Sequence, residues 1–293
     1  MRILLVILSA GLLSACGPSD ERVFHGYLCF VQSPYLMRFS LRDGEITMLA
    51  HLGNRTVREI SPFGEGRLLL SETASVNRKN VARIAWFDLK TGQSESLYSG
   101  VQARYVEDAG TLVYDDGGTL YAVSLADSSD SVLLKHRRNQ LAAMLEISDG
   151  RLLLEMREDG QPVVYLYRAL DGALQRMDAL GARCRLDGAV WIDDLAQLAC
   201  RQRETGGEDA PDGYVLAGLD GDLTGRPELP EGGSLLALAY LPDQGVIVFR
   251  ESREGLFEGQ HNHSVWAHDI RSGENHLLSK TLNLGTSVVY TVH

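Results

Sequence analysis

A block of continuous apolar residues recurs six times along the chain of 293 residues and predicts an all-β fold, a six-bladed β-propeller of four-stranded antiparallel blades. Two further observations support this fold. A polar turn follows every block after a segment of alternating hydrophobicity, and the chain ends in an apolar segment that has no partner within its own repeat.

The N-terminal segment differs from the repeats and has the layout of a signal peptide. Met1-Arg2 supplies a positive charge, an apolar run from Ile3 to Leu8 follows, and small residues end at Ala15. The apolar run is too short to span a bilayer. Leu13-Ser14-Ala15-Cys16 resembles the lipobox of bacterial lipoproteins, in which the cysteine is acylated and becomes the new N-terminus after cleavage.

This resemblance sets the predicted organisation and location of the chain. A plain secretory signal with an incidental cysteine is the alternative. Gly17 stands where aspartate retains enteric lipoproteins in the inner membrane, so the resemblance implies a lipid-anchored protein of the cell envelope, in the outer membrane and facing the periplasm. The predicted parts are a signal peptide at 1–15, a lipidated Cys16 with its linker at 16–25, and the propeller at 26–293.

Each of the six apolar blocks is expected to be a strand that is buried on both faces, because the runs are short and are bounded by glycine and acidic turns. The blocks are Tyr27-Leu28-Cys29-Phe30, Leu68-Leu69-Leu70, Leu112-Val113-Tyr114, Leu152-Leu153-Leu154, Leu198-Ala199-Cys200 and Val246-Ile247-Val248-Phe249.

The alternating segments after these blocks predict a third strand that leads into a hairpin turn. Apolar segments before the blocks, such as 57–60, 144–147 and 236–241, predict a first strand. The turns are Asp43-Gly44, Thr91-Gly92, Asp127-Ser128, Asp171-Gly172, Asp220-Gly221 and Ser272-Gly273. The repeating unit is therefore a four-stranded meander, and six such units predict a ring around a central channel.

The two ends of the chain complete one repeat between them. The chain enters the repeats on a second strand, at 26–32, and finishes on the unpaired segment 287–292. Pairing of these two segments would close the ring, with the C-terminal strand as the missing first strand.

Two stretches resemble a known family. Ile60 to Ser71 and Ile84 to Gly92 are similar to repeats of the TolB-type six-bladed propellers, a WD40-like class, and the resemblance extends over about residues 26–293. The family's Ser-Pro-Asp-Gly turn is kept only in part, at Ser61-Pro62 and Pro242-Asp243. The resemblance implies the propeller fold.

Composition and motifs limit the functional classes. The 39 acidic and 28 basic residues give a net charge of -11, which disfavours sequence-independent binding of nucleic acid. The chain has no Gly-x-Ser-x-Gly, His-Glu-x-x-His or phosphate-loop motif. We therefore expect a protein that is not an enzyme and needs no cofactor. The alternative is a propeller enzyme of lactonase, lyase or glycosidase type that uses channel carboxylates or a metal, and Glu59, Glu107 and Glu146 are the acidic residues on its inner strands. A structural spacer is a third possibility.

No metal site is predicted. His261 and His263 have an i, i+2 spacing that would bind zinc only if a third ligand converged, so they are interpreted as solvated loop residues. The pairs Asp115-Asp116 and Asp193-Asp194 fall in predicted turns and are interpreted as turn-forming residues rather than calcium ligands.

Three cysteines remain after lipidation of Cys16, namely Cys29, Cys184 and Cys200. In a regular hairpin Cys200 lies opposite Ala189, which places Cys184 about 16 Å away at about 3.3 Å per residue. A disulfide needs Cα atoms within about 7 Å. Unless 183–188 folds back, no disulfide forms, and Cys29 and Cys200 are expected to be buried thiols.

The links from each outer strand to the next inner strand should converge on one mouth of the channel, and they are rich in basic residues. Six links at 51–58, 99–105, 135–140, 181–187, 230–235 and 280–286 hold nine basic residues, which include Lys280, against Asp187 and Glu231. A converging positive charge attracts anions, and arginine grips carboxylates or phosphates. Solvated side chains that merely surround the mouth are the alternative. The candidate anion-binding residues are Arg55, Arg58, Arg104, Lys135, Arg137, Arg138, Arg183 and Arg185.

The function predicted from the sequence is a membrane-tethered, periplasm-facing interaction module. Its expected partners are an envelope protein or an anionic polymer at the basic mouth, and the membrane through Cys16.

Overall fold

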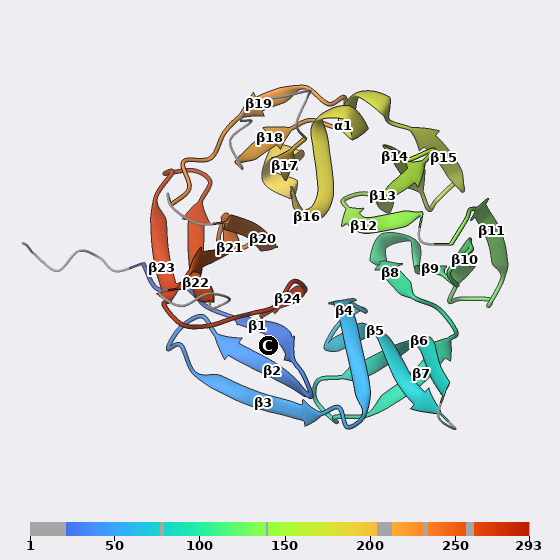
Figure 1. Cartoon of the computed structure of the whole chain (residues 1–293), viewed down its shortest axis with the longest axis horizontal. Helices are drawn as coiled ribbons and strands as arrows, with labels where there is room; N and C mark the ends of the chain where they lie inside the picture. The colour runs from blue at the N-terminus through green and yellow to red at the C-terminus, as the bar shows by residue number, and fades with distance from the viewer. Residues whose placement is uncertain are drawn as a thin grey trace, which may run out of the picture.

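The computed structural model describes residues 22–76, 79–138, 140–203, 213–230, 234–255 and 261–292. Within them, six four-stranded antiparallel sheets stand in a ring, which confirms the predicted six-bladed β-propeller (Figure 1). In chain order, blade I contains β24 and β1–β3, and blades II to VI contain β4–β7, β8–β11, β12–β15, β16–β19 and β20–β23.

The innermost strand of each blade lines the centre of the ring, and the second strand pairs with it. The inner strands are β24 (Val288–Thr291), β4 (Arg55–Pro62), β8 (Gln102–Val106), β12 (Leu141–Ile147), β16 (Cys184–Ile192) and β20 (Ser234–Leu241). The second strands are β1 (Tyr27–Gln32), β5 (Arg67–Val76), β9 (Thr111–Asp115), β13 (Arg151–Glu158), β17 (Gln197–Gln202) and β21 (Val246–Glu254).

The third and fourth strands complete each blade toward the rim. The third strands are β2 (Tyr35–Ser40), β6 (Lys79–Asp88), β10 (Thr119–Ser124), β14 (Gln161–Arg168), β18 (Tyr214–Ala217) and β22 (His261–Asp269). The fourth strands are β3 (Ile46–His51), β7 (Ser94–Tyr98), β11 (Asp130–Lys135), β15 (Ala173–Arg176), β19 (Leu223–Gly225) and β23 (Asn275–Ser279).

The predicted ring closure is present. The last strand, β24, pairs with the first, β1, in an antiparallel register that sets Tyr27 opposite Thr291 and Phe30 opposite Val288. Blade I therefore combines the two ends of the described chain. The hydrogen bonds between β1 and β24 hold the ring shut.

The second strands are apolar on both faces because each face packs against a different neighbouring blade. Leu68 and Leu70 of β5 pack in the cluster between blades I and II, whereas Leu69, on the opposite face, packs between blades II and III. Every one of the six core clusters lies between two successive blades in this way. This arrangement explains why the sequence shows continuous apolar runs rather than alternation.

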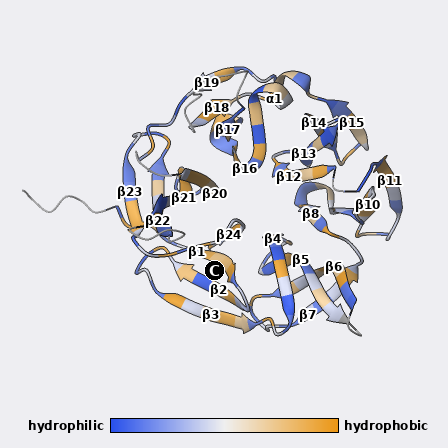
Figure 2. Ribbon diagram, in the orientation of Figure 1, coloured by the Kyte–Doolittle hydropathy of each residue, from blue (hydrophilic) through white to orange (hydrophobic). Residues whose placement is uncertain are grey.

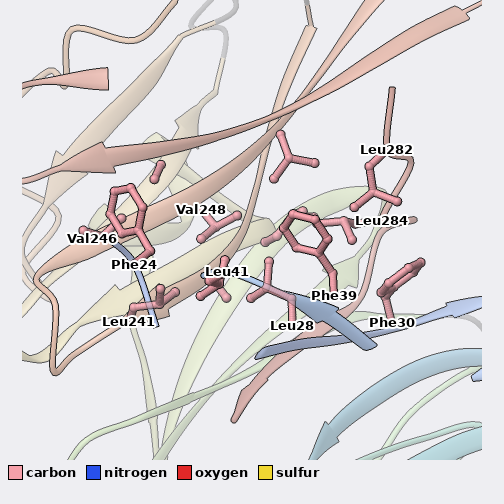
Figure 3. Close-up of a cluster of buried hydrophobic side chains, with 14 of the residues drawn as sticks. Phe24, Leu28, Phe30, Phe39, Leu41, Leu241, Val246, Val248, Leu282 and Leu284 are labelled. Carbon is pink, nitrogen blue, oxygen red and sulfur yellow. The ribbon is translucent and has the colours of Figure 1, made fainter. Parts of the chain in front are cut away.

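The cluster between blades VI and I shows how the N-terminal segment joins the ring (Figure 3). Phe24, which precedes β1, is buried beside Leu241 and Val246 of blade VI, and Leu28 and Phe39 extend the cluster into blade I. The residues before the first strand therefore anchor that strand to the last blade.

The predicted hairpin turns between third and fourth strands are confirmed. Gly44, Gly92, Gly172, Gly221 and Gly273 have φ values between 69 and 85°, which a side chain would strain. Ser128 takes the equivalent position in blade III with a φ of 57°. An aspartate carboxylate accepts backbone N–H bonds in these turns, as between Asp127 and Ser129. The hydrogen bonds from Ser129 lower the pKa of Asp127 to about 2.

The expectation for Cys184 and Cys200 is wrong, because these residues form a disulfide with a Cα–Cα distance of 5.8 Å. The reason is a wide bulge in β16. Arg185 pairs with Arg201 and Val190 with Ala199, so that residues 186–189 stand opposite Cys200 alone and Cys184 is drawn back toward it. Cys29 is a buried free thiol as expected, and burial raises its pKa to about 11.

Two features complete the described chain. A short helix, α1 (Asp178–Arg183), occupies much of the link between blades IV and V, where the sequence predicted no helix. In the described part of the chain, no helix combines the length and the apolar composition needed to cross a membrane. The predicted leader and Cys16 lie outside the described residues.

Candidate functional site

The centre of the ring has two distinct ends. Because neighbouring strands within a blade are antiparallel, every fourth strand ends on the side where the next inner strand begins. We call this side the link face and the opposite side, where inner strands end, the turn face. All predicted anion-binding residues lie on or near the link face.

Bulges shape the inner strands where they line the centre. The register shifts place Arg58, Ala142 and Leu238 as extra residues in β4, β12 and β20, and the larger bulge in β16 has been described above. A bulge redirects side chains, and bulges are frequent beside functional sites. Inner strand β16 carries hydrophobic and hydrophilic residues along its length (Figure 2).

Two connected cavities occupy the centre. The channel cavity, of about 600 Å³, is lined by the inner strands of all six blades. The mouth cavity, of about 830 Å³, is lined by residues at the link face that include Arg58, Arg138 and Asn80. The residues that line both cavities are Glu59, Gln102, Ala142, Asp187, Thr286 and Ser287.

Four of the eight predicted anion-binding residues are used inside the fold. Arg104 forms an ion pair with Glu59 on the neighbouring blade. The closest ion-pair contacts of the others are Arg55 to Glu72 at 3.6 Å, Arg183 to Asp222 at 3.4 Å and Arg185 to Asp187 at 3.5 Å. Arg183 also donates a bond of 2.8 Å to the carbonyl oxygen of Gly221. Their charge is largely compensated within the protein.

The other four basic side chains have no ion pair or side-chain hydrogen bond with any described residue. Arg58 and Arg138 line the mouth cavity, and Lys135 and Arg137 are exposed beside Arg138 on the path from β11 to β12. Only Arg137 and Arg138 lie in a link as the structure defines it, since the other six belong to strands or to α1. Among these eight candidates, the uncompensated positive charge lies on blades II to IV. Lys280, in the link between blades VI and I, is also exposed, but it does not line the mouth cavity.

The acidic residues of the mouth cavity have internal partners. Glu59 pairs with Arg104, and Asp187 contacts Arg201 at 3.0 Å. Asp115 lies 3.1 Å from His136. The predicted turn role of Asp116 is confirmed, because its carboxylate accepts backbone N–H bonds from residues 118 and 119. The mouth cavity therefore combines paired carboxylates with two unpaired arginines.

The three glutamates of the alternative enzyme interpretation all line the channel cavity, although only Glu59 and Glu146 lie on inner strands. Glu107 begins the short 3₁₀ helix η1 (Glu107–Ala109), which follows β8. Glu59 pairs with Arg104, and the backbone N–H of Glu107 donates a 3.2 Å bond to Oε1 of Glu146. Burial raises the pKa of Glu146 to about 7, although the nearby Arg104 charge opposes this rise. Glu146 can therefore exchange a proton near neutral pH.

The histidines and the second acidic pair form no cluster of metal ligands. The interpretation of His261 and His263 as loop residues is wrong, because both lie in strand β22, which continues its hairpin with β21 as far as His261. Their ring centroids are 6.5 Å apart, and Ser252 contacts His263 at 2.9 Å. Asp193 belongs to the short 3₁₀ helix η2 (Asp193–Leu195), while Asp194 pairs with Arg271. Among the described residues, no group of three or more His, Cys, Asp or Glu side chains could hold a metal ion.

Sequence reasoning missed a set of buried acidic residues near the link-face end of the second strands. Asp115 and Glu155 come directly after their apolar runs, and Glu72 and Glu251 come two residues after theirs. This position was the available signal. Each is held by polar partners: Arg83 for Glu72, His136 for Asp115, Arg203 for Glu155 and Trp266 for Glu251. The buried members are Glu72, Asp115, Glu155 and Glu251.

Comparison with known proteins supports the fold but assigns the chain to no protein family. No protein-family model matches the chain, and no curated protein matches it. TolB from Acinetobacter baumannii shares the fold with a TM-score of 0.58 at 11% identity, over 90% of this chain and 65% of that one.

Two enzymes are similar at comparable levels. A puromycin-hydrolysing peptidase of Mycobacterium tuberculosis gives a TM-score of 0.56 at 14% identity, over 90% of this chain and 45% of the enzyme. An oligogalacturonate lyase of Vibrio parahaemolyticus gives 0.51 at 15% identity, over 88% of this chain and 73% of the lyase. This chain thus spans less than two thirds of the first two proteins. At these identities the likeness concerns the fold alone.

Proposed function

We propose that this chain is a non-catalytic interaction module that binds an acidic group of an envelope partner, a protein or an anionic polymer, at the mouth cavity. The observation that carries the proposal is the placement of Arg58 and Arg138 in a cavity whose glutamate and aspartates already have internal partners. Arginine without a protein partner is well suited to bind a carboxylate or phosphate in a bidentate manner.

The proposed tether is compatible with access to this cavity. Arg22, the first described residue, forms an ion pair with Asp269 and donates a hydrogen bond to the Gln244 carbonyl oxygen, and both partners lie on the turn face. A tether that leads to Arg22 would therefore join the fold on the turn face. The mouth cavity opens on the opposite face, away from the point where the chain enters the fold.

Charge reversal tests the proposal. The probe is a fluorescent oligoglutamate peptide, and its binding to the purified protein is measured by anisotropy. We expect Arg58→Glu combined with Arg138→Glu to weaken binding roughly tenfold or more, and added salt to weaken binding to the wild type. Lys280→Glu is the matched control, because Lys280 is exposed and does not line the mouth cavity. Equal binding by all three proteins would remove the basis of the proposal.

A second candidate is an enzyme that uses the channel cavity, and the raised pKa of Glu146 favours it. A carboxyl group that titrates near pH 7 beside an arginine suits general acid–base catalysis. The test is turnover of lactones and aryl glycosides by the wild type and by Glu146→Gln. Turnover that the substitution abolishes would support the enzyme, and stoichiometric calcium or zinc in the purified protein would support its metal-dependent form.

A further inference from the structure

His136 makes an unusual pair of contacts beside the mouth cavity. Its side chain is 2% exposed and that of Asp115 is 4% exposed. Nε2 of the imidazole lies 3.1 Å from Oδ1 of Asp115, and Nδ1 lies 2.8 Å from the carbonyl oxygen of Arg137. Both ring nitrogens therefore face oxygen atoms that accept hydrogen bonds.

The number of protons in this pair follows from its geometry. A carbonyl oxygen can only accept, so Nδ1 of His136 must carry a proton. The contact between Nε2 and Asp115 then needs a second proton, on the ring or on the carboxyl group. In either form the pair holds one proton more than a neutral imidazole beside a carboxylate. If that proton is lost, a nitrogen lone pair faces an oxygen at one of the two contacts.

Backbone hydrogen bonds add to the ring contacts in holding the link that carries the unpaired Arg137 and Arg138. The backbone N–H of His136 donates a 2.9 Å bond to Gly118, and the N–H of Arg137 donates a 2.7 Å bond to Oε1 of Gln140. Arg138 follows directly and lines the mouth cavity. The His136 ring thus ties the start of the link to the end of β9.

We propose that the extra proton shared by His136 and Asp115 holds this link at the mouth cavity, so that binding of acidic groups weakens as the pH rises through the titration of the pair. The inference rests on the proposed interaction function and names a regulation of the same site. Histidine is the side chain whose charge changes most readily between pH 5 and 8.

The surrounding charges define what the pair responds to. Asp116, in the turn after β9, lines the same mouth cavity as Asp115, and its carboxylate accepts backbone N–H bonds from residues 118 and 119. Lys135 and Arg137 are the exposed basic neighbours of His136 on its own segment. An anion bound at Arg138 adds a negative charge near the pair, so binding and proton uptake should reinforce each other.

The experiment measures binding of the fluorescent oligoglutamate peptide to the full chain from pH 5 to pH 8. We expect the wild type to bind roughly tenfold more weakly at the alkaline end. His136→Gln should remove this pH dependence. Asp115→Asn should keep it and move its midpoint to lower pH, because the carboxylate that stabilises the proton is gone. A merely structural role of Asp115 would not move the midpoint. His261→Gln is the matched control and should behave as the wild type does.

A second measurement reads the protonation state without any ligand. Nitrogen-15 spectra of the histidine rings should show both nitrogens of His136 protonated at pH 5, unless the proton resides on Asp115, in which case the carboxyl carbon signal of Asp115 reports it. Binding of the probe without pH dependence, or a pair that carries no extra proton at pH 5, would overturn the inference and leave the proposed function intact. Absence of probe binding at every pH would overturn the proposed function and this regulation together.

Discussion

Glu155 of β13 and Arg203, which directly follows β17, form an ion pair of 2.6 Å that joins blade IV to blade V. The second carboxylate oxygen of Glu155 accepts a 2.7 Å bond from the backbone N–H of Leu186, in the bulge of β16. One buried carboxylate therefore connects two blades and also fixes a segment that lines the channel.

Glu155→Gln tests this connection. The substitution leaves the Arg203 guanidinium, which is 17% exposed, without its compensating charge. We expect the free energy of unfolding to fall by about 2 to 3 kcal/mol. Urea denaturation is the measurement. Glu274→Gln, at a carboxylate that is 71% exposed, is the control and should change stability by less than about 0.5 kcal/mol. A loss no larger than in this control would contradict the role given to Glu155.

The Cys184–Cys200 disulfide should stabilise the propeller through the loop that it closes. The two residues are 16 positions apart, and a loop of this length corresponds to about 3 kcal/mol in the chain-entropy model. We expect a double substitution to serine to lower the urea midpoint, and dithiothreitol to lower the midpoint of the wild type but not that of the double variant. A wild type insensitive to dithiothreitol would show that the bond contributes nothing to stability.

Ring closure by β24 predicts that the same substitution has very different effects on stability at two valines near the end of the chain, Val289 and Val292. Val289 is 4% exposed between blades I and II, while Val292, just beyond the strand, is 52% exposed. Val289→Asp buries a charge in that core and should destabilise the protein by about 3 kcal/mol or more. Val292→Asp should change stability by less than about 0.5 kcal/mol. Thermal unfolding of both variants measures this difference in stability. Similar melting temperatures for the two variants would argue against closure by this strand.

Glu146 should make stability depend on pH in a known direction. Its pKa rises from 4.5 to about 7 on folding because burial penalises the charged form. The native state therefore binds more protons than the unfolded state between these values, and stability falls as the pH rises through the window. We expect Glu146→Gln to remove about 3 kcal/mol of this fall. Urea denaturation at pH 4.5 and pH 8 measures it, and an unchanged pH slope in the variant would contradict the assignment.

The architecture was predictable because its signals are local and repeated. Leu68, Leu69 and Leu70 predict a strand buried on both faces, and Asp171-Gly172 predicts a turn that needs a positive φ. Both depend on neighbours in the sequence. Closure of the ring was predictable for a related reason, since each chain end carries an apolar strand that lacks a partner in its own repeat.

The site was less predictable because it depends on partners that are distant in sequence. The sequence around Arg104 does not reveal that Glu59, on another blade, compensates its charge. The sequence around Arg138 does not reveal that this side chain lines the mouth cavity without a compensating partner among the described residues. The disulfide was missed because regular pairing was assumed for a strand in which four residues bulge out opposite Cys200. A bulge of that size has no sequence signature comparable to a turn.

The proposed function predicts that a partner approaches the link face. Site-specific photo-crosslinking in intact cells tests this claim most directly, with the crosslinker placed at Asn80, an exposed residue of the mouth cavity, or at Leu170, which is 76% exposed on the turn face. We expect a discrete adduct from position 80 that disappears when Arg58 and Arg138 are both replaced by glutamate, and none from position 170. Adducts from position 170 alone, or an adduct at position 80 that survives the charge reversal, would contradict binding at the mouth cavity.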